Sequence, residues 1–86
     1  MTTCIVVFRS KTDLFSFINE FKRSGGRIET VATPKEAKIG CGLSAKIEER
    51  YLSLAVRLIK ADDYNSFFAI YKVKKADGRI STFRVL

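Results

Sequence analysis

Apolar residues near the start of the chain change from a continuous run to a helical period. The run from Cys4 to Phe8 contains three β-branched residues and predicts a central strand covered at least partly on both faces. Ser10 and Asp13 follow at the spacing of a capping box. Gly25 and Gly26 should end the helix that begins there. The apolar positions of this helix recur every three or four residues: Leu14, Phe15, Phe17, Ile18 and Phe21.

Turn signals separate the remaining elements. Pro34 ends one candidate strand, and the segment 62–66, rich in Asp, Asn and Ser, ends a second amphipathic helix. Asp77-Gly78 is the strongest hairpin signal in the chain, because a type I′ turn needs positive φ at both central residues. We therefore expect, in chain order, two strands, a helix and two more strands: Arg27–Thr33, Leu43–Ile47, Arg50–Lys60, Phe67–Val73 and Ile80–Val85.

The predicted element order is βαββαβ with one added strand. This order fits an α+β two-layer sandwich of the ferredoxin-like type, with two helices on one face of an antiparallel sheet. We expect one domain over residues 1–86, a spatial strand order of 4-1-3-2, and the fifth strand beside the fourth. The face without helices should be covered by the terminal hairpin or by a second protomer, and we favour a homodimer. The apolar residues that require this cover lie on both sides of the fourth strand: Phe67, Phe68, Ile70 and Tyr71.

The composition indicates a folded protein of a reducing compartment. Hydrophobic residues make up 47% of the chain, which is enough for a packed core. No apolar run approaches the ~20 residues that cross a bilayer, and the first run lacks the flanks of a secretory signal. Two cysteines do not make the disulfide framework of a small secreted scaffold. We therefore expect a cytoplasmic protein that makes no membrane contact.

Sixteen Lys and Arg residues against nine Asp and Glu residues give a net charge of +7, which suits an anionic partner. The basic residues are spread over both halves of the chain, seven up to Leu43 and nine after it, as on an ordinary solvated surface. Nucleic-acid binding is a less favoured interpretation, because the RNA-recognition module needs aromatic residues on its central strands and the predicted third strand has none. The densest basic group lies in the predicted terminal hairpin: Lys72, Lys74, Lys75, Arg79 and Arg84.

The strongest candidate for chemistry is Cys41, which stands between Gly40 and Gly42 in a loop that also carries lysines. Neither neighbour has a side chain to shield the thiol, so a partner could approach it closely. Lys35 and Lys38 would favour the thiolate, which is the reactive form. Cys4, by contrast, opens an apolar strand and is expected in the core.

The predicted topology brings positive charge to the same loop. The first two strands run parallel, so both end at one rim of the sheet, where the first helix begins. The unpaired N–H groups and positive dipole end of that helix make the rim an anion site. Residues expected to stabilise a thiolate or another anion at this rim are Arg9, Ser10, Lys35 and Lys38.

Three short motifs at these separations resemble those of the putative selenium/sulfur carrier protein-like family. They are Phe8-Arg9-Ser10, Thr33-Pro34-Lys35-Glu36 and Cys41-Gly42-Leu43, and the resemblance covers about residues 4 to 73. It implies a carrier in which Cys41 holds sulfur or selenium as a persulfide or selenopersulfide. It also implies donor and acceptor proteins as partners.

Other chemistry fits the chain less well. The chain has no histidine, so a cysteine–histidine site is excluded, and we expect a carrier and not an enzyme. Two cysteines alone cannot supply a zinc site unless a dimer shares them, so we expect no metal and no cofactor. Two alternatives for Cys41 stay open: it is a small core residue, or it is incidental to a regulatory module that binds partners through its open sheet face.

Overall fold

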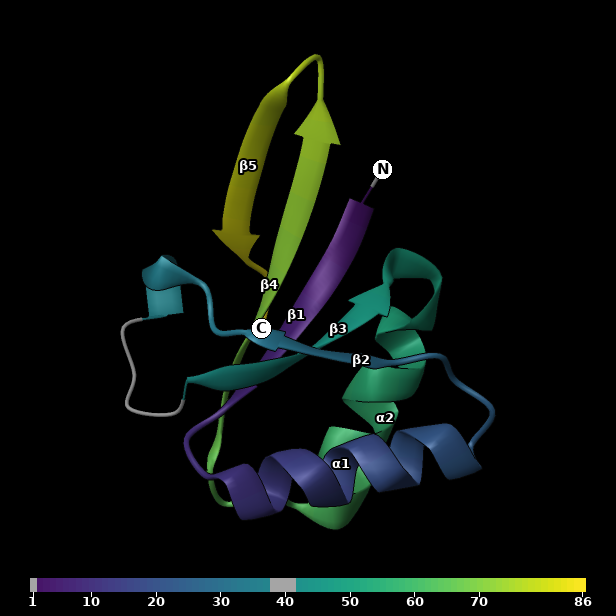
Figure 1. The fold of residues 1–86 in the computed structure, drawn as a ribbon. Helices are drawn as coiled ribbons and strands as arrows, with labels where there is room; N and C mark the ends of the chain where they lie inside the picture. The colour runs from purple at the N-terminus through teal and green to yellow at the C-terminus, as the bar shows by residue number, and fades with distance from the viewer. Residues whose placement is uncertain (1, 38–41) are drawn as a thin grey trace.

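The computed structural model describes residues 2–37 and 42–86, which form one antiparallel sheet and two α-helices (Figure 1). The sheet order is β2-β3-β1-β4-β5, and every neighbouring pair is antiparallel. The expected α+β class is therefore confirmed, and so is the pairing of the fifth strand with the fourth. The bounds are β1 Thr2–Phe8, α1 Lys11–Arg23, β2 Glu29–Ala32, β3 Leu43–Glu48, α2 Leu52–Asp62, β4 Phe67–Ala76 and β5 Arg79–Arg84, with short 3₁₀ turns η1 Lys35–Ala37 and η2 Glu49–Tyr51.

Helix α1 begins and ends where the sequence predicts. Ser10 is its N-cap, with the side chain accepting a hydrogen bond from the Asp13 backbone N–H at 3.1 Å. At the other end Gly25 has a φ of 89°, which an L side chain rarely adopts. The N–H groups of Gly25 and Gly26 donate to the carbonyls of Lys22 and Phe21, so the helix closes in a Schellman motif.

The β4–β5 hairpin has the expected turn, but its first strand is longer than predicted. Asp77 and Gly78 have φ values of 52° and 75°, as a type I′ turn requires. The register with β5 continues to the Ala76–Arg79 pair, so β4 runs three residues beyond Val73. Cross-strand hydrogen bonding extends this strand through Lys74 and Lys75, where the apolar pattern has already ended.

The main core lies between the helices and one face of the sheet. Phe8 of β1 is fully buried, and its ring packs at 5.3 Å from Phe17 of α1 and 5.4 Å from Tyr64. These centroid distances are typical of favourable aromatic pairs. The other fully buried side chains of this core include Cys4, Val6, Leu14, Phe17, Phe21, Ala45 and Ile70.

The opposite face of the sheet holds a second, smaller apolar cluster, which we call the second-face cluster. Its buried members are Ile5, Val7, Ala37, Ala69 and Tyr71, with Val31, Phe68 and Val73 packed against them. Ala37 belongs to η1, so this short turn covers part of the face. The hairpin does not fold over this face, because β5 extends the sheet at its edge. That alternative for covering the face is therefore wrong.

Among the described residues, no helix has the length and apolar content needed to cross a membrane.

Candidate functional site

The candidate site is the loop between β2 and β3. Lys38, Gly40 and Cys41 lie outside the residues that the structure describes. The two ends of the loop are joined by a hydrogen bond from the Thr33 N–H to the Gly42 carbonyl, 3.0 Å long. The hydroxyls of Thr33 and Ser44 lie 2.8 Å apart in a second hydrogen bond, and Ser44 is fully buried. These two hydrogen bonds therefore hold the first and last residues of the loop together, where β2 ends and β3 begins.

The first arm of the loop packs against the second-face cluster. Ala37 is only 4% exposed there, because its methyl group lies against the cluster. The Tyr71 hydroxyl donates to the Glu36 carbonyl at 3.5 Å, which ties η1 to the central part of the sheet. Lys35 of the same turn is exposed. The chain that leads toward Cys41 is thus anchored up to Ala37.

Arg9 lies beside the same cluster. Its guanidinium carbon is 5.2 Å from the centroid of the Phe68 ring, and that of Arg84 is 5.3 Å from the same centroid. Arg84 also donates to the Phe68 carbonyl at 3.2 Å. Phe68 packs against the second-face cluster, to which Ala37 also belongs, so both guanidinium groups lie over a side chain of that cluster. Arg84 belongs to β5, as expected for a residue of the terminal hairpin.

Ser10 is engaged in a hydrogen-bond network at the start of α1. Its hydroxyl accepts from the Asp13 N–H, and its own N–H donates to the Ser66 hydroxyl at 3.3 Å. Ser66 in turn donates to the Asp13 carboxylate through its hydroxyl at 2.6 Å and its N–H at 3.1 Å. The capping box is therefore closed through Ser66, and the Asp13 carboxylate supplies the negative charge that the helix N-terminus favours.

Gly42 leaves open space beside the loop. A Cβ atom built at this residue would meet no described atom within 4 Å, and the residue is exposed. The described part of the fold therefore does not require glycine here on steric grounds.

Cys4 is sealed in the main core, as the sequence predicts. Its side chain is 0% exposed, and burial raises the pKa of its thiol above the ordinary value of 9.0. Lys72 faces it from β4 and lowers this pKa by a smaller amount. Lys72 also forms an ion pair with Glu49 at 2.8 Å, and this hydrogen-bonded pair lowers the pKa of Glu49 and raises that of Lys72. Cys4 is therefore unsuited to thiol transfer in the folded protein.

Sequence reasoning missed residues that position the site through contacts between distant segments. Ser66 contacts the start of α1 across 53 residues of chain, and Ser44 contacts Thr33 across 11. Ala37 gave no signal because it stands between charged residues in an apparent loop. A fully buried serine in an alternating strand is recognisable only once the strand order is known.

One comparison with known proteins identifies a family. The family model described as "Putative Se/S carrier protein-like" matches residues 3–71 of the 86. The match begins in β1, includes the Cys41 loop and ends within β4. No curated protein and no solved structure matches the chain.

Proposed function

The chain belongs to the putative Se/S carrier protein-like family, and we propose that it carries sulfur or selenium on Cys41 between partner proteins. The observation that carries this proposal is the burial of Cys4, the other cysteine of the chain. A folded carrier needs an accessible thiol, and Cys4 is closed to any partner. The family match includes the loop that holds Cys41.

The proposed transfer is a thiolate exchange without net oxidation. The Cys41 thiolate attacks the terminal sulfur of a donor persulfide, R–S–SH, and a new S–S bond forms to Cys41. The bond between the two donor sulfurs breaks, and the donor leaves as its thiolate, R–S⁻. An acceptor nucleophile then attacks the terminal sulfur on Cys41, and the Cys41 thiolate leaves. A selenopersulfide donor would transfer selenium by the same displacement.

Positive charge near the loop supports the thiolate in this proposal. Lys35 belongs to the loop's anchored arm, Lys38 stands within the loop sequence, and Arg9 lies over Phe68 of the second-face cluster on which that arm packs. Gly40 and Gly42 would admit the partner's sulfur, in keeping with the open space beside Gly42. The chain has no histidine to act as a general base at neutral pH, so we propose a carrier that depends on donor and acceptor enzymes. A reducing cytoplasm suits this role, because Cys41 must be a free thiol to accept cargo.

We also infer that the fold is a ferredoxin-like βαββαβ unit extended by β5. The order β2-β3-β1-β4 with antiparallel neighbours supports this classification, as do two helices that share one core with one face of the sheet.

The test uses a small-molecule donor, glutathione persulfide, so that no partner has to be identified first. We expect mass spectrometry to find one added sulfur on the wild type and on Cys4→Ala, and none on Cys41→Ser. Circular dichroism confirms that each variant is folded. Sulfur that adds equally to Cys41→Ser, or that adds to no folded variant, would overturn the proposal.

A further inference from the structure

The end of the β4–β5 hairpin extends beyond the rest of the sheet. The register between β1 and β4 starts at the Thr2–Lys74 pair, whereas β4 and β5 pair as far as Ala76 and Arg79. In Figure 1 this end projects away from α1 and α2. The family match stops at residue 71, so the segment from Lys72 to Leu86 lies outside it. The hairpin is therefore a feature that the family assignment does not explain.

Strand β5 is at the edge of the sheet and presents backbone groups there. The Ala76–Arg79 pair flanks a two-residue turn, so these residues exchange hydrogen bonds with each other. The alternation of an antiparallel ladder then directs the N–H and C=O groups of Ile80 and Thr82 away from β4. Such an edge is a template for another strand.

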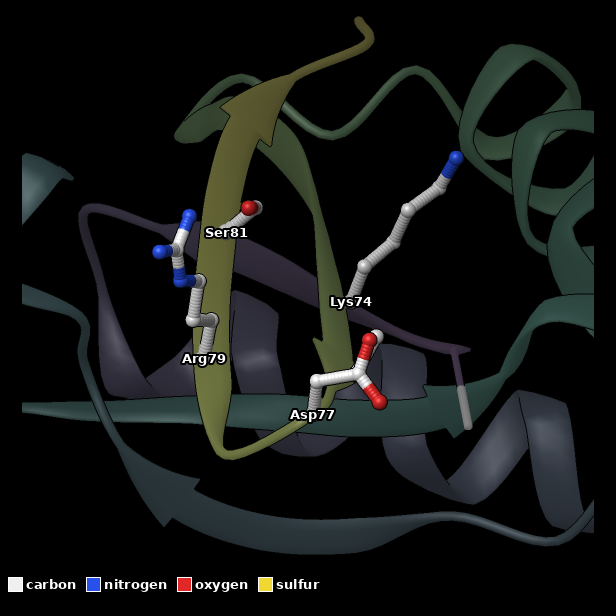
Figure 2. A pocket seen from close by; sticks show the side chains of 5 residues that line it. Lys74, Asp77, Arg79 and Ser81 are labelled. Carbon is white, nitrogen blue, oxygen red and sulfur yellow. The ribbon is translucent and has the colours of Figure 1, made fainter.

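The side chains along this edge have a charged face and an apolar face. Phe83 pairs with Lys72, and Lys72 pairs with Cys4, whose side chain belongs to the main core. Phe83 therefore lies on the side of the hairpin that continues the helix-covered face of the sheet. Because alternate residues of a strand share a face, Arg79 and Ser81 lie on that side too. A hollow of about 510 Å³ on this side is lined by Lys74, Ala76, Asp77, Arg79 and Ser81. In Figure 2 Arg79 extends past the outer side of β5, away from β4. Ile80 is on the other side and is 67% exposed.

The charge of the hairpin indicates the kind of strand that would bind. Five basic residues and one acidic residue lie between Lys72 and Leu86. Lys72 is bonded to Glu49, and the Lys74 ammonium group lies 5.6 Å from the centroid of the Phe83 ring, but Arg79 extends past the outer side of β5 (Figure 2). Two copies pairing through β5 would bring two basic hairpins together, which disfavours self-association. An acidic strand would instead place a carboxylate beside Arg79.

We propose that the free edge of β5 binds an acidic, extended protein segment as an added strand. A carboxylate of that segment lies beside Arg79, its apolar residues lie beside Ile80, and its backbone pairs with Ile80 and Thr82. A nucleic acid is the weaker candidate, because it would use neither the backbone groups of the strand edge nor the exposed Ile80 side chain. This docking is independent of the role proposed for Cys41.

The test uses a synthetic nonapeptide in which Glu and Val alternate. We expect titration to shift the amide NMR signals of Ile80 and Thr82 most strongly. A peptide with N-methyl groups on alternate amides should not bind, because it cannot donate to the strand edge. A Lys-Val peptide of the same length should not bind either, because its charge is reversed.

Variants of the protein separate charge from strand pairing. Arg79→Glu should weaken the peptide affinity roughly fivefold or more, whereas the same reversal at exposed Arg57 on α2 should have little effect. Thr82→Pro should abolish binding, because it removes an outward N–H group but no bond to β4. Both variants are compared with the wild type by their NMR spectra to confirm folding.

Three results would overturn the inference: no binding of the Glu-Val peptide, equal binding of the N-methylated peptide, or equal loss in Arg57→Glu. Binding of a single-stranded RNA oligonucleotide without peptide binding would assign the hairpin to nucleic acid. Sedimentation of the protein as a dimer that Thr82→Pro dissociates would assign the edge to a second copy. A failure of the carrier test leaves these measurements unaffected, since Cys41→Ser should bind the peptide as the wild type does.

Discussion

Gly26 and Gly42 are both glycines next to loops, but their surroundings differ. A Cβ atom at Gly26 would overlap the Phe21 ring, which is fully buried in the main core. A Cβ atom at Gly42 would meet no described atom within 4 Å. Glycine is therefore a packing requirement at Gly26, whereas at Gly42 the described structure leaves the position free for a functional role.

The two glycines give a matched pair of alanine variants. Gly26→Ala should lower the free energy of unfolding by about 1–3 kcal/mol, because the new methyl group forces Phe21 out of its place in the core. Gly42→Ala should change it by less than about 0.5 kcal/mol. Urea unfolding followed by circular dichroism measures both. A loss of stability in Gly42→Ala as large as in Gly26→Ala would contradict the open space described beside the loop.

Burial of the Cys4 thiol predicts a change of stability at alkaline pH. Because burial raises the pKa of Cys4, the unfolded chain releases the thiol proton near its ordinary pKa of 9.0, while the folded protein retains it. The contribution of Cys4 to stability is therefore complete below pH 9 and decreases as pH rises toward the pKa of the folded state. The comparison is made in a Cys41→Ser background, between the protein that keeps Cys4 and the Cys4→Ala variant. The difference between their free energies of unfolding should decrease steadily above pH 9. A difference that stays constant up to the limit of folding would show that the Cys4 thiolate is tolerated in the core.

At the level of elements, the start of α1 shows which contacts are predictable from sequence. Ser10 and Asp13 are three residues apart, so their capping interaction is local and was expected. Ser66 completes the network from the loop between α2 and β4. No local pattern identifies that residue, because the contact depends on how helix and sheet pack.

Ser66 should therefore contribute to stability although it lies in a loop. Ser66→Ala removes a donor to the Asp13 carboxylate and an acceptor for the Ser10 N–H, and should cost about 1–3 kcal/mol in free energy of unfolding. Ser53→Ala, at an exposed position on α2, is the control and should be neutral or slightly stabilising. Equal effects of the two variants in urea unfolding would mean that the Ser66 network contributes nothing.

Element boundaries deviate from the sequence pattern where pairing or tight turns outweigh apolar periodicity. Helix α2 starts at Leu52, because the chain first makes the 3₁₀ turn η2. It ends at Asp62, and Asp63 follows as a left-handed C-cap with a φ of 49°. Strand β4 continues to Ala76 because β5 supplies hydrogen bonds to a polar stretch. The apolar period along the sequence indicates which residues are buried. The bounds of α2 and the end of β4 depend instead on tight turns and on backbone hydrogen bonding.

At the scale of the whole molecule, the pattern of apolar residues predicts the layer of helices and the sheet. It does not predict which residues cover the face of the sheet that has no helices. Apolar residues on both sides of β4 indicated correctly that the second face is partly buried. The cover by η1 was not predicted, since a single alanine between charged residues has no periodic signal. The same limit applies around Phe68, where Arg9 and Arg84 come together from separate segments of the chain.

The position of Cys4 makes its thiol a probe of global unfolding. Cys4 lies in β1, which pairs with β3 on one side and β4 on the other, and its side chain belongs to the main core. A reagent can reach it only if the centre of the sheet opens, and a central strand opens with the whole molecule.

In a Cys41→Ser background, the alkylation rate of Cys4 should therefore give the same free energy of opening as urea unfolding, within about 0.5–1 kcal/mol. The comparison holds under conditions where the sheet closes faster than the reagent reacts. Ser66→Ala, which weakens the packing of α1, should lower both free energies by the same amount. An opening energy from alkylation that lies well below the urea value would mean that β1 separates from β3 or β4 without unfolding of the helices. The sheet and its helical layer would then be two cooperative units.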